Sequence, residues 1–189
     1  MRIVATYSFN GGEETIQKHY AEELREITQI FSLFSIQECK TERTKGKAKS
    51  TKPLYNSQKM NRVINGEFAK LGWRKQEISE DYPTEYYVDG YNPPATSKRM
   101  AMKIDFTKNH LGVDIALNKK GLPIYSGCAK MTIFHNMGHI DVGIEIVPVK
   151  ELAEDMSSGV SYFEQFVWDL EKRGVSDIDI PVLILGVAP

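Results

Sequence analysis

The sequence lacks the features that mark several classes of protein. It has only two cysteines, Cys39 and Cys128, which are too few for a disulfide framework and do not have the spacing of metal ligands. No apolar run is long enough to span a bilayer, and the first residues lack the apolar stretch and cleavage site of a signal peptide. We therefore expect a soluble cytoplasmic protein that does not act at a membrane.

An excess of charge of one sign is also missing, since the formal net charge is −1. Any surface that binds nucleic acid must therefore come from an uneven distribution of charge along the chain. Residues 40–52 contain six basic residues and one acidic residue, without apolar periodicity. This pattern predicts a mobile basic loop, in which Lys45, Lys47 and Lys49 could contact phosphates. The alternative is a solvated loop without a partner.

What the sequence does contain is enough apolar material for a core. With 41% hydrophobic and 26% charged residues in 189 positions, it fits a single domain spanning residues 1–189. The periodicity predicts an α/β fold with a central mixed sheet and helices on both faces. Residues 73–81 look like a polar connection. The expected strands are 2–7, 85–88, 103–106, 111–118, 140–147 and 181–187, and the expected helices are about 13–35, 57–71, 124–137, 148–156 and 162–173.

Two aspartates stand out at the centre of this pattern. Apolar and other residues alternate along 111–118, so Asp114 and Ala116 project from the same face of a strand. Asp105 lies on the preceding strand, across a turn-prone segment at 107–110. Two converging carboxylates suit a hard divalent cation. The alternative is that each aspartate only ends a strand or faces water.

Three segments around these positions resemble a known family. They are residues 103–117, 140–152 and 156–162. The chain resembles type II restriction endonucleases of the BglII and BstYI group, which have a restriction-endonuclease-like PD-(D/E)XK fold. The resemblance implies a symmetric homodimer that cuts double-stranded palindromic DNA, with a GATC core, using Mg²⁺. A two-fold symmetric site is the physical reason for a two-fold symmetric protein.

The resemblance also implies roles for particular residues. Asp105 matches the first metal-binding aspartate, and Asp114 matches the acid on the next strand, which is usually Glu. Together with a backbone carbonyl near Ile115 they would hold Mg²⁺. At position 116 the close relatives have Gln, BamHI has Glu and the wider fold has Lys, whereas this chain has Ala116. An engineered substitution, a natural loss of cleavage, and replacement by Lys119 all remain open, although strand parity argues against Lys119.

The resemblance further implies contacts with DNA. Ser157, Ser158 and Ser161 match a segment that reads bases, although they could equally cap a helix. Asn118 and Lys119 match a region close to DNA. Two further functions compete with an active endonuclease. They are a DNA-binding protein without catalysis, which Ala116 favours, and a metal-dependent hydrolase unrelated to DNA, which the basic loop disfavours.

Overall fold

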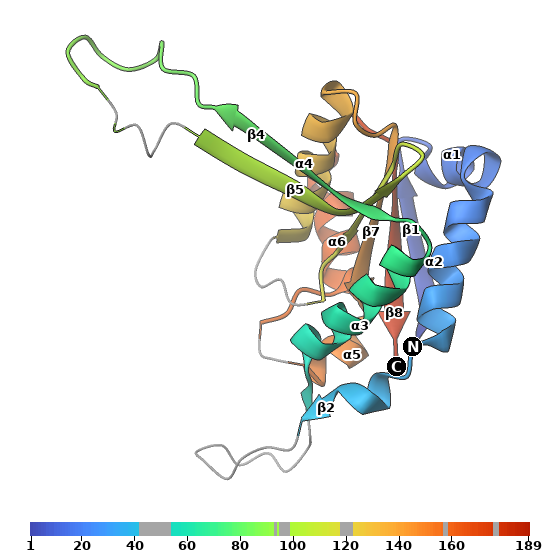
Figure 1. Cartoon of the computed structure of the whole chain (residues 1–189). Coiled ribbons are helices and arrows are strands. Elements are labelled where there is room, and N and C mark those ends of the chain that lie inside the picture. Colours follow the sequence, from blue (N-terminus) through green and yellow to red (C-terminus); the bar gives the residue numbers. More distant parts are fainter. Residues whose placement is uncertain (42–53, 93, 95–98, 118–122, 157–158, 176–177) are drawn as a thin grey trace, which may run out of the picture.

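The protein is built around a six-stranded mixed sheet with helices on both faces (Figure 1). This confirms the α/β architecture that the sequence predicts. The computed structural model describes residues 1–41, 54–92, 94, 99–117, 123–156, 159–175 and 178–189.

The middle of the sheet is parallel and its outer pairs are antiparallel. β6, β7 and β8 run parallel, whereas β1 pairs antiparallel with β8, and β5 pairs antiparallel with β6 and β4. The three parallel strands are buried along their whole length, which explains their nearly continuous apolar sequences. The spatial order is β1 (Arg2–Phe9), β8 (Val182–Ala188), β7 (Val142–Pro148), β6 (Leu111–Ile115), β5 (Arg99–Lys108) and β4 (Arg74–Asp81). A separate small sheet pairs β2 (Lys40–Thr41) with β3 (Leu54–Tyr55).

The two faces of the sheet pack against different helices. On one face, Val113 and Ile115 join a large apolar cluster with α1, α2, α3 and α5. On the other face, Ala116 joins a smaller cluster with α4 and α6. The helices are α1 (Gly12–His19), α2 (Ala21–Leu33), α3 (Ser57–Lys70), α4 (Pro123–Asn136), α5 (Lys150–Glu154) and α6 (Phe163–Arg173), with a short 3₁₀ turn η1 (Ile36–Cys39). Among the described residues, no helix has the length and apolar character needed to cross a membrane.

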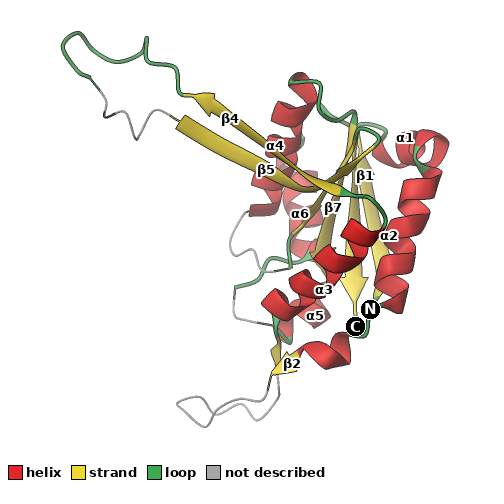
Figure 2. Cartoon of the chain, viewed as in Figure 1, coloured by secondary structure: helices red, strands yellow, loops and turns green. Residues whose placement is uncertain are grey.

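The prediction for the segment between α3 and β5 is wrong. Residues 74–81 form strand β4, whereas residues 85–88 form turns and bends and no strand. β4 is an edge strand in which Ile78 alone is buried, so its sequence shows no apolar alternation. Tyr86 and Val88 suggested a strand but are 82% and 78% exposed. Figure 2 shows that β4 and β5 extend beyond the helices, with this segment at their far end.

The single helix predicted for residues 13–35 is also wrong, because the chain bends at Tyr20. That residue has φ −134°, and it separates α1 from α2. Ile16 before the bend and Ile27 after it enter the same apolar cluster, so the apolar stripe continues although the helix does not. No glycine or proline marks the bend. By contrast, a glycine does end α3, since Gly72 has a left-handed φ of +82°, which is common just after a helix.

Candidate active site

A tight hairpin between β5 and β6 sets the positions of the two aspartates. Its two turn residues, Asn109 and His110, have positive φ angles of 49° and 65°, as two-residue hairpins with a right-handed twist require. The paired residues run from the turn to Phe106 and Val113. Asp105 and Asp114 are the next residues on their strands. They therefore face each other where the ladder ends.

The two aspartates replace the missing ladder bonds with their own carboxylates. The backbone N–H of Asp105 donates to Oδ1 of Asp114 at 3.3 Å, and the backbone N–H of Ile115 donates to Oδ2 of Asp105 at 3.1 Å. The pairing of β5 with β4 also shifts register between Ile104 and Thr107, beside Asp105. Such irregularities often re-aim side chains next to active sites. Both carboxylates are thus held by backbone groups.

A lysine on the opposite helix completes the cluster. Nζ of Lys130 lies 2.8 Å from Oδ2 of Asp114, and the two side chains are only 17% and 1% exposed. Glu145 of β7, which pairs in register with Asp114, is fully buried. Burying a carboxylate is costly unless a cation or hydrogen bonds compensate, which gives the lysine a clear electrostatic role. Sequence reasoning missed Lys130. The available signal was that it is the only charged residue within α4.

Two glycines allow α4 to lie close to β7. A Cβ atom on Gly127 would lie 2.8 Å from Oε2 of Glu145, and a Cβ atom on Gly143 would lie 2.4 Å from Sδ of Met131. Real Cβ atoms do not approach other atoms this closely. A Cβ atom at either glycine would force a fully buried side chain, Glu145 or Met131, to move, so both glycines ease the close approach of helix and strand. That approach also sets the position of Lys130, one helical turn after Gly127.

The two carboxylates fit a hard divalent cation that takes its remaining ligands from water and substrate. In the part of the chain that the structure describes, no group of three or more His, Cys, Asp or Glu side chains is arranged to hold a metal ion. Mg²⁺, however, usually takes one or two carboxylates and completes its octahedron with water and substrate phosphate. Asp105 and Asp114 provide two such carboxylates. Their roles as ligands stay predictions.

Position 116 contributes no polar side chain to this site. Ala116 is fully buried in the apolar cluster that also contains Cys128 and Val147. Its backbone N–H donates to the carbonyl of Ile146 at 2.8 Å, which continues the parallel ladder past the end of β6. A longer side chain at this position would need space that α4 and β7 now fill.

Of the residues predicted to contact DNA, Ser161 is the one that lies within the described residues. Ser161 is only 4% exposed, so a contact with a base would require it to become accessible. The other predicted contacts stay predictions, because they lie outside the described residues: Lys45, Lys47, Lys49, Asn118, Lys119, Ser157 and Ser158.

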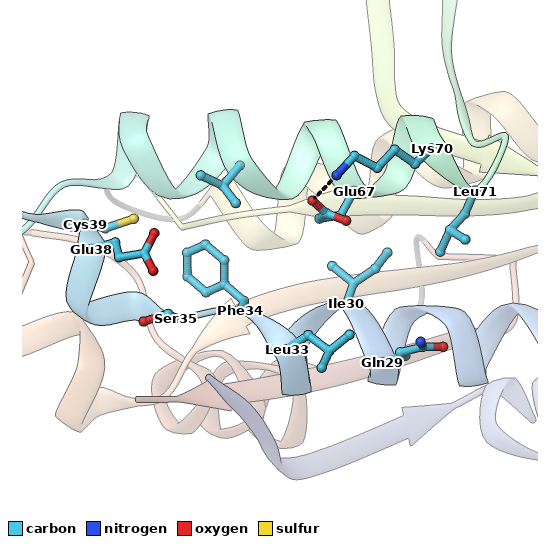
Figure 3. A pocket seen from close by; sticks show the side chains of 11 residues that line it. Gln29, Ile30, Leu33, Phe34, Ser35, Glu38, Cys39, Glu67, Lys70 and Leu71 are labelled. Atoms are coloured by element: carbon cyan, nitrogen blue, oxygen red, sulfur yellow. Dashed lines mark hydrogen bonds and ion pairs between the residues drawn. The ribbon is translucent and has the colours of Figure 1, made fainter.

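An apolar pocket of about 390 Å³ lies on the opposite face of the sheet, between α2 and α3 (Figure 3). Its wall includes Ile30, Phe34 and Cys39, which belong to the large apolar cluster. Burial raises the pKa of the Cys39 thiol, so this sulfur is a poor nucleophile at neutral pH. The pocket and the carboxylates of Asp105 and Asp114 lie on opposite faces of the sheet.

Comparisons with known proteins agree with this picture. The family model for restriction endonuclease BglII/BglIII matches residues 4–187. The crystal structure of free BglII has the same fold, with a TM-score of 0.65 and 13% sequence identity, and the match covers 100% of this chain and 80% of that chain. No curated protein sequence matches the chain. Because the family model covers nearly every residue, the chain belongs to the BglII/BglIII family of restriction endonucleases, which are site-specific deoxyribonucleases.

Proposed function

We propose that this endonuclease cuts a short palindrome with a GATC core, as a homodimer, and that Mg²⁺ is held by Asp105, Asp114 and a backbone carbonyl near Ile115. The observation that supports this most is the pair of reciprocal hydrogen bonds between the two aspartates and the backbone of β5 and β6. It brings two carboxylates together at the end of a ladder, beside the half-buried ammonium group of Lys130. The palindrome and its core rest on the sequence resemblance.

When bound, Mg²⁺ would polarise a phosphoryl oxygen and lower the pKa of an attacking water. The chain contributes rigid placement of the ligands. Asp114 is one methylene shorter than the Glu of related enzymes, which moves a carboxylate by about 1 Å, whereas catalytic geometry tolerates roughly 0.5 Å. Here the short side chain reaches the N–H of Asp105 directly, so the carboxylate lies against β5.

A direct test uses Asp105→Asn, with Asp179→Asn as a control at an exposed aspartate away from the site. The chain as it stands should cut phage DNA into discrete fragments in Mg²⁺. Asp105→Asn should cut about a hundredfold more slowly or worse, because a metal ion contributes several kcal/mol of charge stabilisation in the transition state. Asp179→Asn should cut normally. Normal cutting by a folded Asp105→Asn protein would show that the metal site is misplaced.

The basic residues at 45, 47 and 49 remain part of the proposal as phosphate contacts. Removing Lys45, Lys47 and Lys49 together should lower the slope of log affinity against log salt, by about one unit for each phosphate that a lysine no longer neutralises. A filter-binding titration at several salt concentrations measures this slope. An unchanged slope would place the three lysines outside the interface.

Ala116 favours a second candidate, a sequence-specific DNA-binding protein on the same fold that does not cut. Incubating the chain and its Ala116→Gln variant with the same DNA and Mg²⁺ separates the two. Fragments from the Gln variant alone would indicate a disabled endonuclease. Specific fragments from the chain with Ala116 would exclude this candidate. Because position 116 is fully buried, the thermal unfolding midpoint of the variant should be measured alongside.

A further inference from the structure

We propose that Lys130 of α4 holds the attacking water, and so replaces the side chain that is missing at position 116. This inference rests on the proposed function, because it needs Asp105 and Asp114 to be the metal ligands. In the related enzymes, the side chain at the position of Ala116 would have this role. Here an ammonium group on a helix would position the water instead.

The position of Lys130 is the first argument. Its Nζ atom is 2.8 Å from Oδ2 of Asp114, so it lies within hydrogen-bond distance of a proposed metal ligand. A water bound near that ligand is therefore within reach of the same ammonium group. Ala116 lies two residues after Asp114, on the same α4-facing side of the sheet. A longer side chain at 116 and the side chain of Lys130 would thus approach the reaction from one side.

The chemistry of the group is the second argument. A lysine ammonium has three N–H donors on one compact charge. Within the described residues, the bond to Asp114 takes one of them. The others can hold a water and a phosphoryl oxygen. In the hydrolysis, the water oxygen bonds to phosphorus while the bond to the leaving ester oxygen breaks with its electron pair. A proton from the water passes to solvent, and the leaving oxygen takes up a proton.

The environment of Lys130 is the third argument. It is the only charged residue of a helix that is otherwise apolar or neutral, and it is 17% exposed. A buried ion pair is weak evidence for stability, because apolar side chains of similar volume often serve as well. Two glycines that lack room for a Cβ atom bring this helix against β7. The arrangement places the ammonium group of this helix beside a proposed metal ligand.

The test compares Lys130→Met with Lys172→Met, a control at an exposed lysine of α6 on the same side of the sheet. In single-turnover assays with excess protein, Lys130→Met should cut at least about a hundredfold more slowly, the range typical of a positioned catalytic group. Its affinity for cognate DNA in Ca²⁺ should change less than about threefold. Calorimetric titration with Mn²⁺ should show unchanged or tighter binding, because a competing cation has been removed. The control should behave like the wild type.

A conservative variant provides a second test. Where Lys130→Met does not fold, Lys130→Arg keeps the ion pair and should cut at least about tenfold more slowly, since the larger planar group cannot occupy the same point. A wild-type rate from a folded Met or Arg variant would overturn the proposal, as would equal losses in rate and in DNA affinity.

The outcomes also separate this inference from the proposed function. If Asp105→Asn is slow and Lys130→Met is fast, only the role of Lys130 is wrong. If both cut normally, the metal site itself is wrong. If the chain cuts only after Ala116→Gln, the endonuclease site is correct and Lys130 does not replace residue 116.

Discussion

The two faces of the central sheet differ in kind, although they alternate along a single strand. On one face of β6, Val113 and Ile115 pack into the large apolar cluster under α1, α2, α3 and α5. On the other face, Asp114 is just as deeply buried, but its carboxylate forms an ion pair with Lys130 of helix α4. Both faces bury hydrocarbon, since Met131 and Phe134 of α4 pack on the second face. The second face also buries the carboxylate of Asp114, at a cost that the apolar packing must offset.

This contrast separates stability from chemistry within the molecule. We expect that the apolar face can lose a side chain without moving the carboxylates, because backbone groups hold them. The charged face should tolerate little change in position, because catalytic geometry is sensitive to shifts of about 0.5 Å. Variants on the two faces should therefore have different signatures in unfolding and in DNA cutting.

The largest effect on stability is expected from Phe31→Ala on α2. Phe31 is fully buried in the large apolar cluster. Its truncation should lower the free energy of unfolding by about 3–5 kcal/mol, the usual cost of Phe→Ala in a core. Urea denaturation measures this loss. The rate of cutting per folded molecule should stay at the wild-type value. A proportional fall in that rate would show that the two faces are coupled.

An intermediate effect is expected from Gly143→Ala on β7. The added Cβ atom would lie 2.4 Å from Sδ of Met131, so the fully buried Met131 side chain must move and press on α4. Overpacking of this kind costs about 1–3 kcal/mol. Single-turnover cutting should also slow, because α4 carries Lys130.

The matched control for this change is Gly66→Ala on α3, where a new Cβ atom meets nothing within 4 Å. There the alanine should stabilise the helix by up to about 1 kcal/mol. Slower cutting by Gly66→Ala, or a normal rate from Gly143→Ala, would contradict the role given to the packing of α4.

The smallest effect is expected from Leu33→Gln at the rim of the α2–α3 pocket. Leu33 is 76% exposed, so its replacement removes little buried hydrocarbon. The free energy of unfolding should change by no more than about 0.5 kcal/mol, and cutting should not change. Thermal unfolding and the fragment assay check both. A loss of cutting would mean that this pocket takes part in the function.

Much of the fold was predictable because its strongest patterns are local. The buried strands β6, β7 and β8 show as apolar or alternating runs, and Gly72 marks the end of α3. The failures have local causes too. β4 is an edge strand with a polar sequence, and the bend at Tyr20 has no glycine or proline to announce it. Secondary structure is predicted from the periodicity of apolar residues. Neither the polar edge strand nor the bend at Tyr20 produces a distinct periodicity.

The candidate site was predictable only in part. Sequence spacing placed Asp105 and Asp114 on neighbouring strands, but not the reciprocal hydrogen bonds at the end of the ladder. Those bonds depend on where the pairing of β5 with β6 stops. Lys130 is 16 residues from Asp114 in the chain, on a helix that the periodicity predicted without indicating which neighbour its lysine would meet.

By itself, the sequence determined the α/β class, the approximate limits of most elements and the pair of aspartates, because these follow from residue type at short spacing. It also showed that position 116 holds no polar side chain. Tertiary structure decided which polar side chain lies near this position instead. The close packing of α4 on β7, which Gly127 and Gly143 permit, places the ammonium of Lys130 beside Asp114. The contact between Lys130 and Asp114 joins two separate elements, and their distance depends on the volumes of the side chains between them. The periodicity of residues within either element therefore does not predict this contact.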